Sequence, residues 1–246
     1  MAVKKKSRMR KMYFLRFLYR ALVLVALGAM LALRPETADV IRGSAVLEQF
    51  HPTHLFLYFL WGVWMLDMIF QIVPSKGLFA MGSLKVFKRS YSPCAGCDKV
   101  ERRALRRRYL KEALLVWTFW GPLSAALAVA WFAWLKPAGA YWFPLLFVGA
   151  FYVCDLICVL FWCPFRVFFM KNRCCTTCRI FNWDHLMMFT PFLFVPGMYS
   201  WSLAGLSVVI FIIWEILIYT HPERFTDKCN DTLKCKNCTD RLCGKF

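Results

Sequence analysis

Nine of the twelve cysteines gather in three short polar segments, at spacings typical of metal-binding sites. Thiolate is a soft ligand, and two sulfurs separated by two residues can hold one metal ion from a tight turn. The spacing therefore predicts cysteine-ligated zinc or an iron–sulfur cluster, and it does not distinguish between these cofactors. The candidate metal ligands are Cys94, Cys97, Cys174, Cys175, Cys178, Cys229, Cys235, Cys238 and Cys243.

The grouping of these thiols into sites stays open. The tail 221–246 alone supplies four thiolates, which is enough for one closed tetrahedral site. A second set of four would combine the Cys94/Cys97 pair with the Cys175/Cys178 pair, but the tail could equally complete a site with either loop. The turn at Cys94 contains a glycine and suits zinc, whereas the tail spacing matches neither common ferredoxin pattern.

Three carboxylates interrupt apolar segments and are the candidate catalytic residues: Asp67, Asp155 and Glu215. A carboxylate in hydrocarbon costs about 2.5–3.5 kcal/mol on insertion scales, so it normally faces the interior of a bundle and has a partner. At similar depths these three could line a polar cavity that conducts a proton or cation, or that polarises a substrate. The alternative is that each carboxylate lies near the interface and pairs with a nearby Arg, Lys or Trp N–H.

Two further cysteines, Cys154 and Cys158, lie one helical turn apart beside Asp155. Buried thiols behave as small hydrophobic groups, so we expect them to serve packing. The alternative is a relay between the bilayer and the other sulfurs.

The apolar segments predict an all-α polytopic membrane protein with six transmembrane helices. The chain has 246 residues, is 60% hydrophobic and has a mean hydropathy of +0.49, which is too apolar for a soluble domain. About 20 apolar residues cross a bilayer as a helix. The fifth segment is short and contains Pro191 and Pro196. The predicted spans are 13–33, 52–73, 113–135, 141–163, 185–199 and 201–219.

The basic residues predict that both termini face the cytoplasm, in a plasma or inner membrane. All of the 32 lysines and arginines except Arg34, Arg42 and Lys136 fall in four segments on one side of the predicted spans. These segments are 1–20, 74–112, 164–184 and 220–246. The first residues also resemble a signal peptide, but they lack a clean cleavage site, so we expect them to be retained.

A cytoplasmic location has consequences for partners and for the cysteines. The net charge of +18 favours anionic lipid headgroups on that face, whereas nucleic acid is not an expected partner. Thiols are kept reduced in the cytoplasm, so disulfides are disfavoured and metal binding is favoured.

The chain is expected to form a membrane domain, 1–220, with cytoplasmic loops 74–112 and 164–184. The cysteine-rich tail 221–246 follows it, and it looks too polar to order itself without a metal.

Three functional hypotheses follow from these patterns. The first is a membrane redox protein whose cytoplasmic iron–sulfur centres exchange electrons with a cytoplasmic donor. The second is a zinc-stabilised membrane protein that acts on or transports a lipid, ion or small substrate through the carboxylate-lined cavity. The third is a soft-metal transporter or sensor. No nucleotide-binding or hydrolase motif is present, so the sequence leaves open whether the protein is an enzyme.

Overall fold

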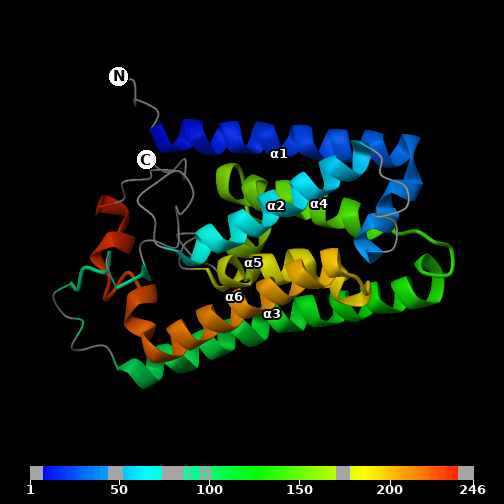
Figure 1. Cartoon of the computed structure of the whole chain (residues 1–246). Helices are drawn as coiled ribbons and strands as arrows, with labels where there is room; N and C mark the ends of the chain where they lie inside the picture. Colours follow the sequence, from blue (N-terminus) through cyan, green and yellow to red (C-terminus); the bar gives the residue numbers. More distant parts are fainter. Residues whose placement is uncertain are drawn as a thin grey trace.

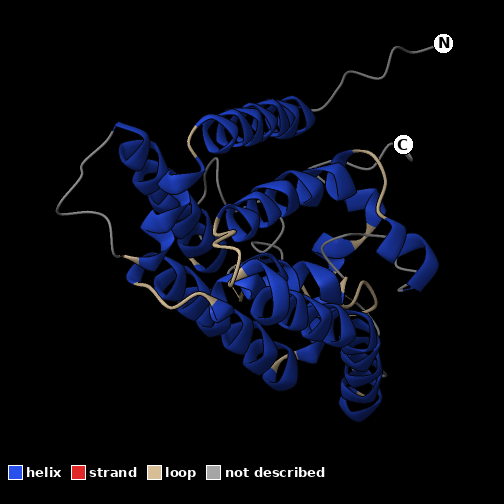
Figure 2. Ribbon diagram, turned by 90° about the vertical axis from the view of Figure 1, so that its right-hand side faces the viewer, coloured by secondary structure: helices blue, strands red, loops and turns tan. Residues whose placement is uncertain are grey.

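The computed structural model describes residues 8–43, 52–73, 86–88, 90–94, 97, 101–169 and 178–237. Within these residues the chain is all-helical and contains no strand, which confirms the all-α part of the predicted fold class (Figure 2). The α-helices are α1 (Arg8–Leu33), α2 (Pro52–Ile72), α3 (Arg102–Ala130), α4 (Trp142–Leu160), α5 (Arg179–Phe189) and α6 (Met198–Thr220). The shorter helical turns are η1 (Pro35–Arg42), η4 (Trp131–Leu135), η5 (Phe165–Phe169), η7 (Thr190–Phe194), η8 (Pro222–Phe225), η9 (Asp231–Leu233) and η10 (Cys235–Asn237).

Five helical segments are long and apolar enough to cross a membrane. Their most apolar windows have mean hydropathies between 1.7 and 2.3, and most residues of each window are not buried inside the protein. Such an apolar exterior is what a bilayer requires of a spanning helix. The five segments are Arg10–Leu33, Pro52–Ile72, Arg102–Leu135, Trp142–Leu160 and Met198–Thr220.

The segment predicted as the fifth span, 185–199, is a short broken helix inside the bundle. Helix α5 has 11 residues, which is about 16 Å of helix, and the tighter turn η7 continues it. Pro191 lies in the first turn of η7 and Pro196 follows its end. Helix α5 packs against α3, α4 and α6, so it depends on these neighbours rather than on lipid. A sixth complete span is therefore not shown by the structure.

The helices run back and forth along one axis, so that α1 begins and α6 ends at the same end of the bundle (Figure 1). Helix α1 packs on α4, and α2 packs on α6. Trp64 lies at the centre of the core, where its ring contacts those of Tyr152, Phe189 and Phe192. These aromatic contacts join α2, α4, α5 and η7, and they hold the broken helix inside the bundle.

The opposite end of the bundle is closed where η1 meets the start of α6. Ser200 donates a hydrogen bond to the carbonyl oxygen of Ile41 at 3.0 Å. Gly197 precedes α6 and lies directly against the backbone of η1: a Cβ added there would clash with the carbonyl oxygen of Ile41 and would lie 2.8 Å from backbone carbons of Arg42. Only glycine lets the two segments approach so closely.

We expect Gly197→Ala to destabilise the fold by about 1–3 kcal/mol, because backbone atoms of η1 would have to move to admit the methyl group. Thermal unfolding in detergent measures this loss. Gly205→Ala is the matched control, because a Cβ at Gly205 meets nothing within 4 Å. Equal unfolding temperatures for the two variants would contradict the close approach at Gly197.

Candidate functional site

A buried arginine on α1 joins two of the three predicted carboxylates. Arg20 is 7% exposed, and its Nη2 donates to Oδ2 of Asp67 on α2 at 2.9 Å. Its Nη1 donates to Oδ2 of Asp155 on α4 at 3.1 Å and to the carbonyl oxygen of Tyr152 at 2.9 Å. The guanidinium carbon lies 3.7 Å from the centre of the Tyr152 ring. Three helices distant in sequence are therefore tied to one cation.

Sequence reasoning did not anticipate this role for Arg20. The residue lies near the start of a predicted span, where a long side chain can extend to the interface. The structure instead turns the side chain into the bundle, where two carboxylates neutralise its charge. An arginine inside an apolar segment, with two acidic residues in other segments, was the signal available in the sequence.

Arg20, Asp67 and Asp155, here called the Arg20 cluster, line a pocket. Residues of the broken helix α5 line it as well. The space enclosed by the pocket and its opening is about 700 Å³. On α5, Asp184 accepts a hydrogen bond from the backbone N–H of His185 at 2.6 Å, and its Oδ1 lies 2.7 Å from Nδ1 of the same histidine. Gln71 of α2 donates from Nε2 to Oδ1 of Asp184 at 3.4 Å. The pocket thus brings Asp67 and Asp155 together with Asp184.

The wall of the pocket includes a buried hydrogen-bond acceptor that is unpaired among the described residues. Gln71 is 8% exposed, and its Oε1 has no hydrogen-bond partner among the described residues. Arg20 already directs its terminal nitrogens at Asp67, Asp155 and the backbone. An unpaired buried acceptor costs about 1–3 kcal/mol, so a donor supplied from outside would be stabilised there.

The third predicted carboxylate, Glu215, lies apart from this pocket. Both of its oxygens accept hydrogen bonds from Nη2 of Arg179, at 2.6 and 2.7 Å, and Nε1 of Trp183 donates to it at 3.0 Å. Glu215 is absent from the pocket wall. Its arrangement is the alternative considered from the sequence, in which an acidic residue pairs with an arginine and an indole N–H.

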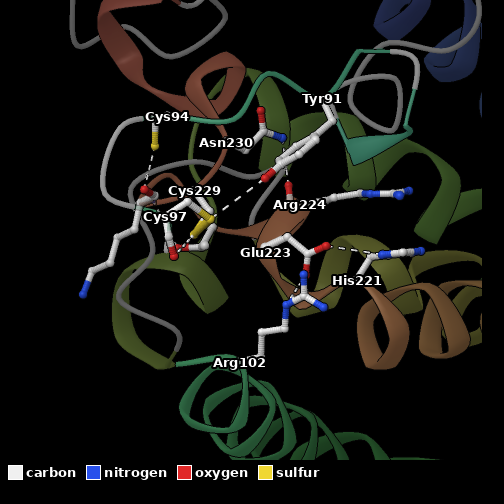
Figure 3. Close-up of a disulfide and its surroundings, with 11 residues drawn as sticks. Tyr91, Cys94, Cys97, Arg102, His221, Glu223, Arg224, Cys229 and Asn230 are labelled. Carbon is white, nitrogen blue, oxygen red and sulfur yellow. Dashed lines mark hydrogen bonds and ion pairs between the residues drawn. A yellow bond between two sulfur atoms is a disulfide. The ribbon is translucent and has the colours of Figure 1, made fainter. Parts of the chain in front are cut away.

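At the end of the bundle where α6 finishes, the tail docks on the segment that carries the C-x2-C pair (Figure 3). Pro93 and Asn230 form an isolated antiparallel bridge. The N–H of Cys94 donates to the carbonyl oxygen of Cys229 at 3.2 Å. Cys97 and Cys229 are joined as a disulfide, with their Cα atoms 4.6 Å apart. The thiol of Cys94 is not in a disulfide and donates to a carbonyl oxygen of the tail at 2.6 Å.

This disulfide differs from the expectation that a cytoplasmic location disfavours disulfides. Tail and loop do meet through their cysteines, but the described contact between them is a sulfur–sulfur bond. Among the residues that the structure describes, no three His, Cys, Asp or Glu side chains converge on a metal site. Cys174, Cys175, Cys238 and Cys243, and the side chain of Cys235, lie outside the described residues. The predicted thiolate sites therefore stay predictions.

The described part of the tail is ordered by apolar contacts, contrary to the expectation that only a metal would order it. Phe225 is 3% exposed, and its ring meets those of Tyr109 on α3 and Trp214 on α6. One apolar residue inserted into an existing core can anchor a segment that has no core of its own. On the exposed side, the Lys234 ammonium lies 2.8 Å from Asp231 and lowers the pKa of that carboxyl.

Replacing Arg20 by methionine should destabilise the protein by about 3–5 kcal/mol, because the partly buried Asp67 and Asp155 would be left without their cation. Adding Asp67→Asn and Asp155→Asn to Arg20→Met should recover part of this loss. Urea unfolding in detergent measures the differences, with the exposed Arg103→Met as the control. A stability of Arg20→Met equal to that of Arg103→Met would show that the cluster contributes nothing.

Comparisons of the chain with protein-family models, with curated proteins and with solved structures found no match.

Proposed function

We propose that the protein is an integral membrane protein that binds a small cationic ligand carrying N–H donors in the Arg20–Asp67–Asp155 pocket. The observation that carries this proposal is the buried Oε1 of Gln71, which has no hydrogen-bond partner among the described residues. A protonated amine supplies both the donor that this oxygen lacks and a charge that the carboxylates attract.

The charges of the pocket support a cationic ligand. Its walls carry three aspartates, of which Asp184 is paired with His185, and two arginines, Arg16 and Arg20. An anion would meet the same carboxylates, while the buried arginine is already engaged by two of them. Attraction and repulsion between charges are stronger inside a low-dielectric bundle than in water, so the pocket discriminates more sharply between cations and anions.

The interruption between α5 and η7 supports the proposal that a ligand binds within the membrane-spanning part of the protein. Non-helical backbone within a membrane is tolerated where it is buried in protein or lines a cavity. Asp184 and His185 lie on α5, and η7 continues directly from it. A short inner helix can shift without moving a complete span, which would change access to the pocket.

We also propose that both ends of the chain face the cytoplasm, and that α5 with η7 serves as a sixth, incomplete crossing. Two features support this orientation: α1 begins where α6 ends, and the basic start of α3 lies at that same end (Figure 1). There, Nε of Arg106 donates to the carbonyl oxygen of Tyr219 at 2.9 Å. Anionic lipid headgroups at that face are the expected partners of the remaining arginines.

The amines ethylamine and putrescine should raise the unfolding temperature of the purified protein, whereas acetate and succinate should not. Stabilisation by a ligand reaches about 2.7 kcal/mol at 100 times its Kd. Gln71→Leu and Asp155→Asn should abolish the effect, and Gln71→Glu, which keeps an acceptor, should retain it. Each variant is measured against its own unfolding temperature without amine, which separates binding from folding.

Glu215→Gln is the matched control, because this carboxylate is partly buried but lies outside the pocket. It should bind amines as the parent protein does. The proposal would be overturned if acetate or succinate raised the unfolding temperature. It would also be overturned if Gln71→Leu bound amines as the parent protein does.

A second candidate function is electron transfer at the cysteine-rich end, favoured by the meeting of Cys94, Cys97 and Cys229. Cytoplasmic disulfides are usually transient and catalytic or redox-sensing. The same thiols, once reduced, are suitable ligands for zinc or iron, alone or together with the remaining tail cysteines. This candidate therefore includes a cysteine-ligated cofactor and a cytoplasmic electron donor.

Anaerobic purification should yield protein with bound iron and sulfide, or with zinc, and Cys229→Ser should lower the metal content. Elemental analysis and visible absorption distinguish the two metals. Air-oxidised protein should instead give a non-reduced peptide that links Cys97 to Cys229. Cys154→Ser, outside this cluster, should leave both results unchanged. Anaerobic protein without iron, sulfide or zinc would exclude the cofactor.

A further inference from the structure

A second pocket, lined by four cysteines, lies next to the charged pocket. Cys154 and Cys158 come from α4, Cys163 follows the end of that helix, and Cys178 precedes α5. The remaining wall is largely aromatic and aliphatic and includes Phe151 and Phe165. The space within the pocket and its opening is about 660 Å³.

Two of these thiols are in contact with each other. Helix α4 ends at Leu160, and Pro164 follows Cys163, so the chain turns back at the helix end. This turn brings Cys163 to Cys158, and their side chains are hydrogen-bonded. Neither residue is in a disulfide. Two adjacent thiols are the reduced form of a pair that can close to a disulfide by losing two electrons and two protons.

The walls of the pocket indicate which oxidant would fit. The lining is mainly apolar and its aromatic rings can stack on a planar ring, so a flat, uncharged, membrane-soluble molecule suits it better than a charged one. Asp155 and Asp184 line this pocket as well as the charged one. They lie where a proton released by a thiol could be accepted and then passed to the bound molecule.

We propose that Cys158 and Cys163 are a redox-active thiol pair that reduces a quinone bound in this pocket. Both S–H bonds break and one S–S bond forms between the two residues. The two electrons and two protons pass to the quinone, which leaves as the quinol, so the reaction balances without another reactant. The site is distinct from the Cys97–Cys229 disulfide, and it does not depend on amine binding in the charged pocket.

The test is a single turnover of the full-length, fully reduced protein in detergent, mixed without oxygen with decylubiquinone. We expect quinol formation, followed by absorbance, and a peptide containing Cys158 and Cys163 that has lost two hydrogen masses. Cys158→Ser and Cys163→Ser should each yield one quinol equivalent less per chain than the parent. Cys154→Ser, a thiol of the same pocket one turn away on α4, should yield the parental amount.

Two outcomes would overturn the proposal. One is equal quinol yield from the parent and from both serine variants, which would place the reaction at other cysteines. The other is oxidation that links Cys158 or Cys163 to a different cysteine. Amine stabilisation of the same variants is measured in parallel: if it persists while quinol formation is lost, the two sites are independent.

Discussion

The arrangement of the bundle depends on the neutralisation of one buried cation. A guanidinium cannot stay in an apolar interior without partners, and Arg20 obtains them from two other helices, through Asp67 and Asp155. Because each hydrogen bond requires a particular depth, the pairs set the positions of α1, α2 and α4 along the bundle axis. The aromatic contacts around Trp64 then fill the space that these three helices enclose with α5.

The same constraint explains why the pocket is available for a ligand. Ionised carboxylates cannot donate a hydrogen bond to Oε1 of Gln71, and Arg20 directs its terminal nitrogens at Asp67, Asp155 and the backbone. Among the described residues, the interior therefore keeps a polar group without a hydrogen-bond partner. Such groups are uncommon in stable folds, and the proposed ligand would supply the missing donor.

Cysteines lie in two places near this charged pocket. At the bundle end, Cys97 and Cys229 tie the tail to the segment before α3. Cys158 and Cys163 line a mainly apolar pocket that shares Asp155 and Asp184 with the charged one.

The sequence by itself determined the helical class, the apolar segments, and the gathering of basic residues and cysteines toward one end. These properties are local, because hydropathy and composition are read within windows about as long as one helix. The weakest prediction from those windows was the span at 185–199, where two prolines shorten the helix and the neighbours of α5 replace lipid. Its burial within the bundle depends on α3, α4 and α6, which no single window contains.

Only the tertiary structure decided which groups meet. Asp67 and Asp155 share Arg20, whereas Glu215 takes Arg179, although all three acidic residues have similar apolar surroundings in the sequence. Cys97 joins Cys229 across a sequence separation of 132 residues, and Phe225 anchors a tail that looked too polar to be ordered. Spacing along the chain specifies partners only within a few turns. Contacts between distant segments follow from the packing of complete helices and from the need to pair every buried charge.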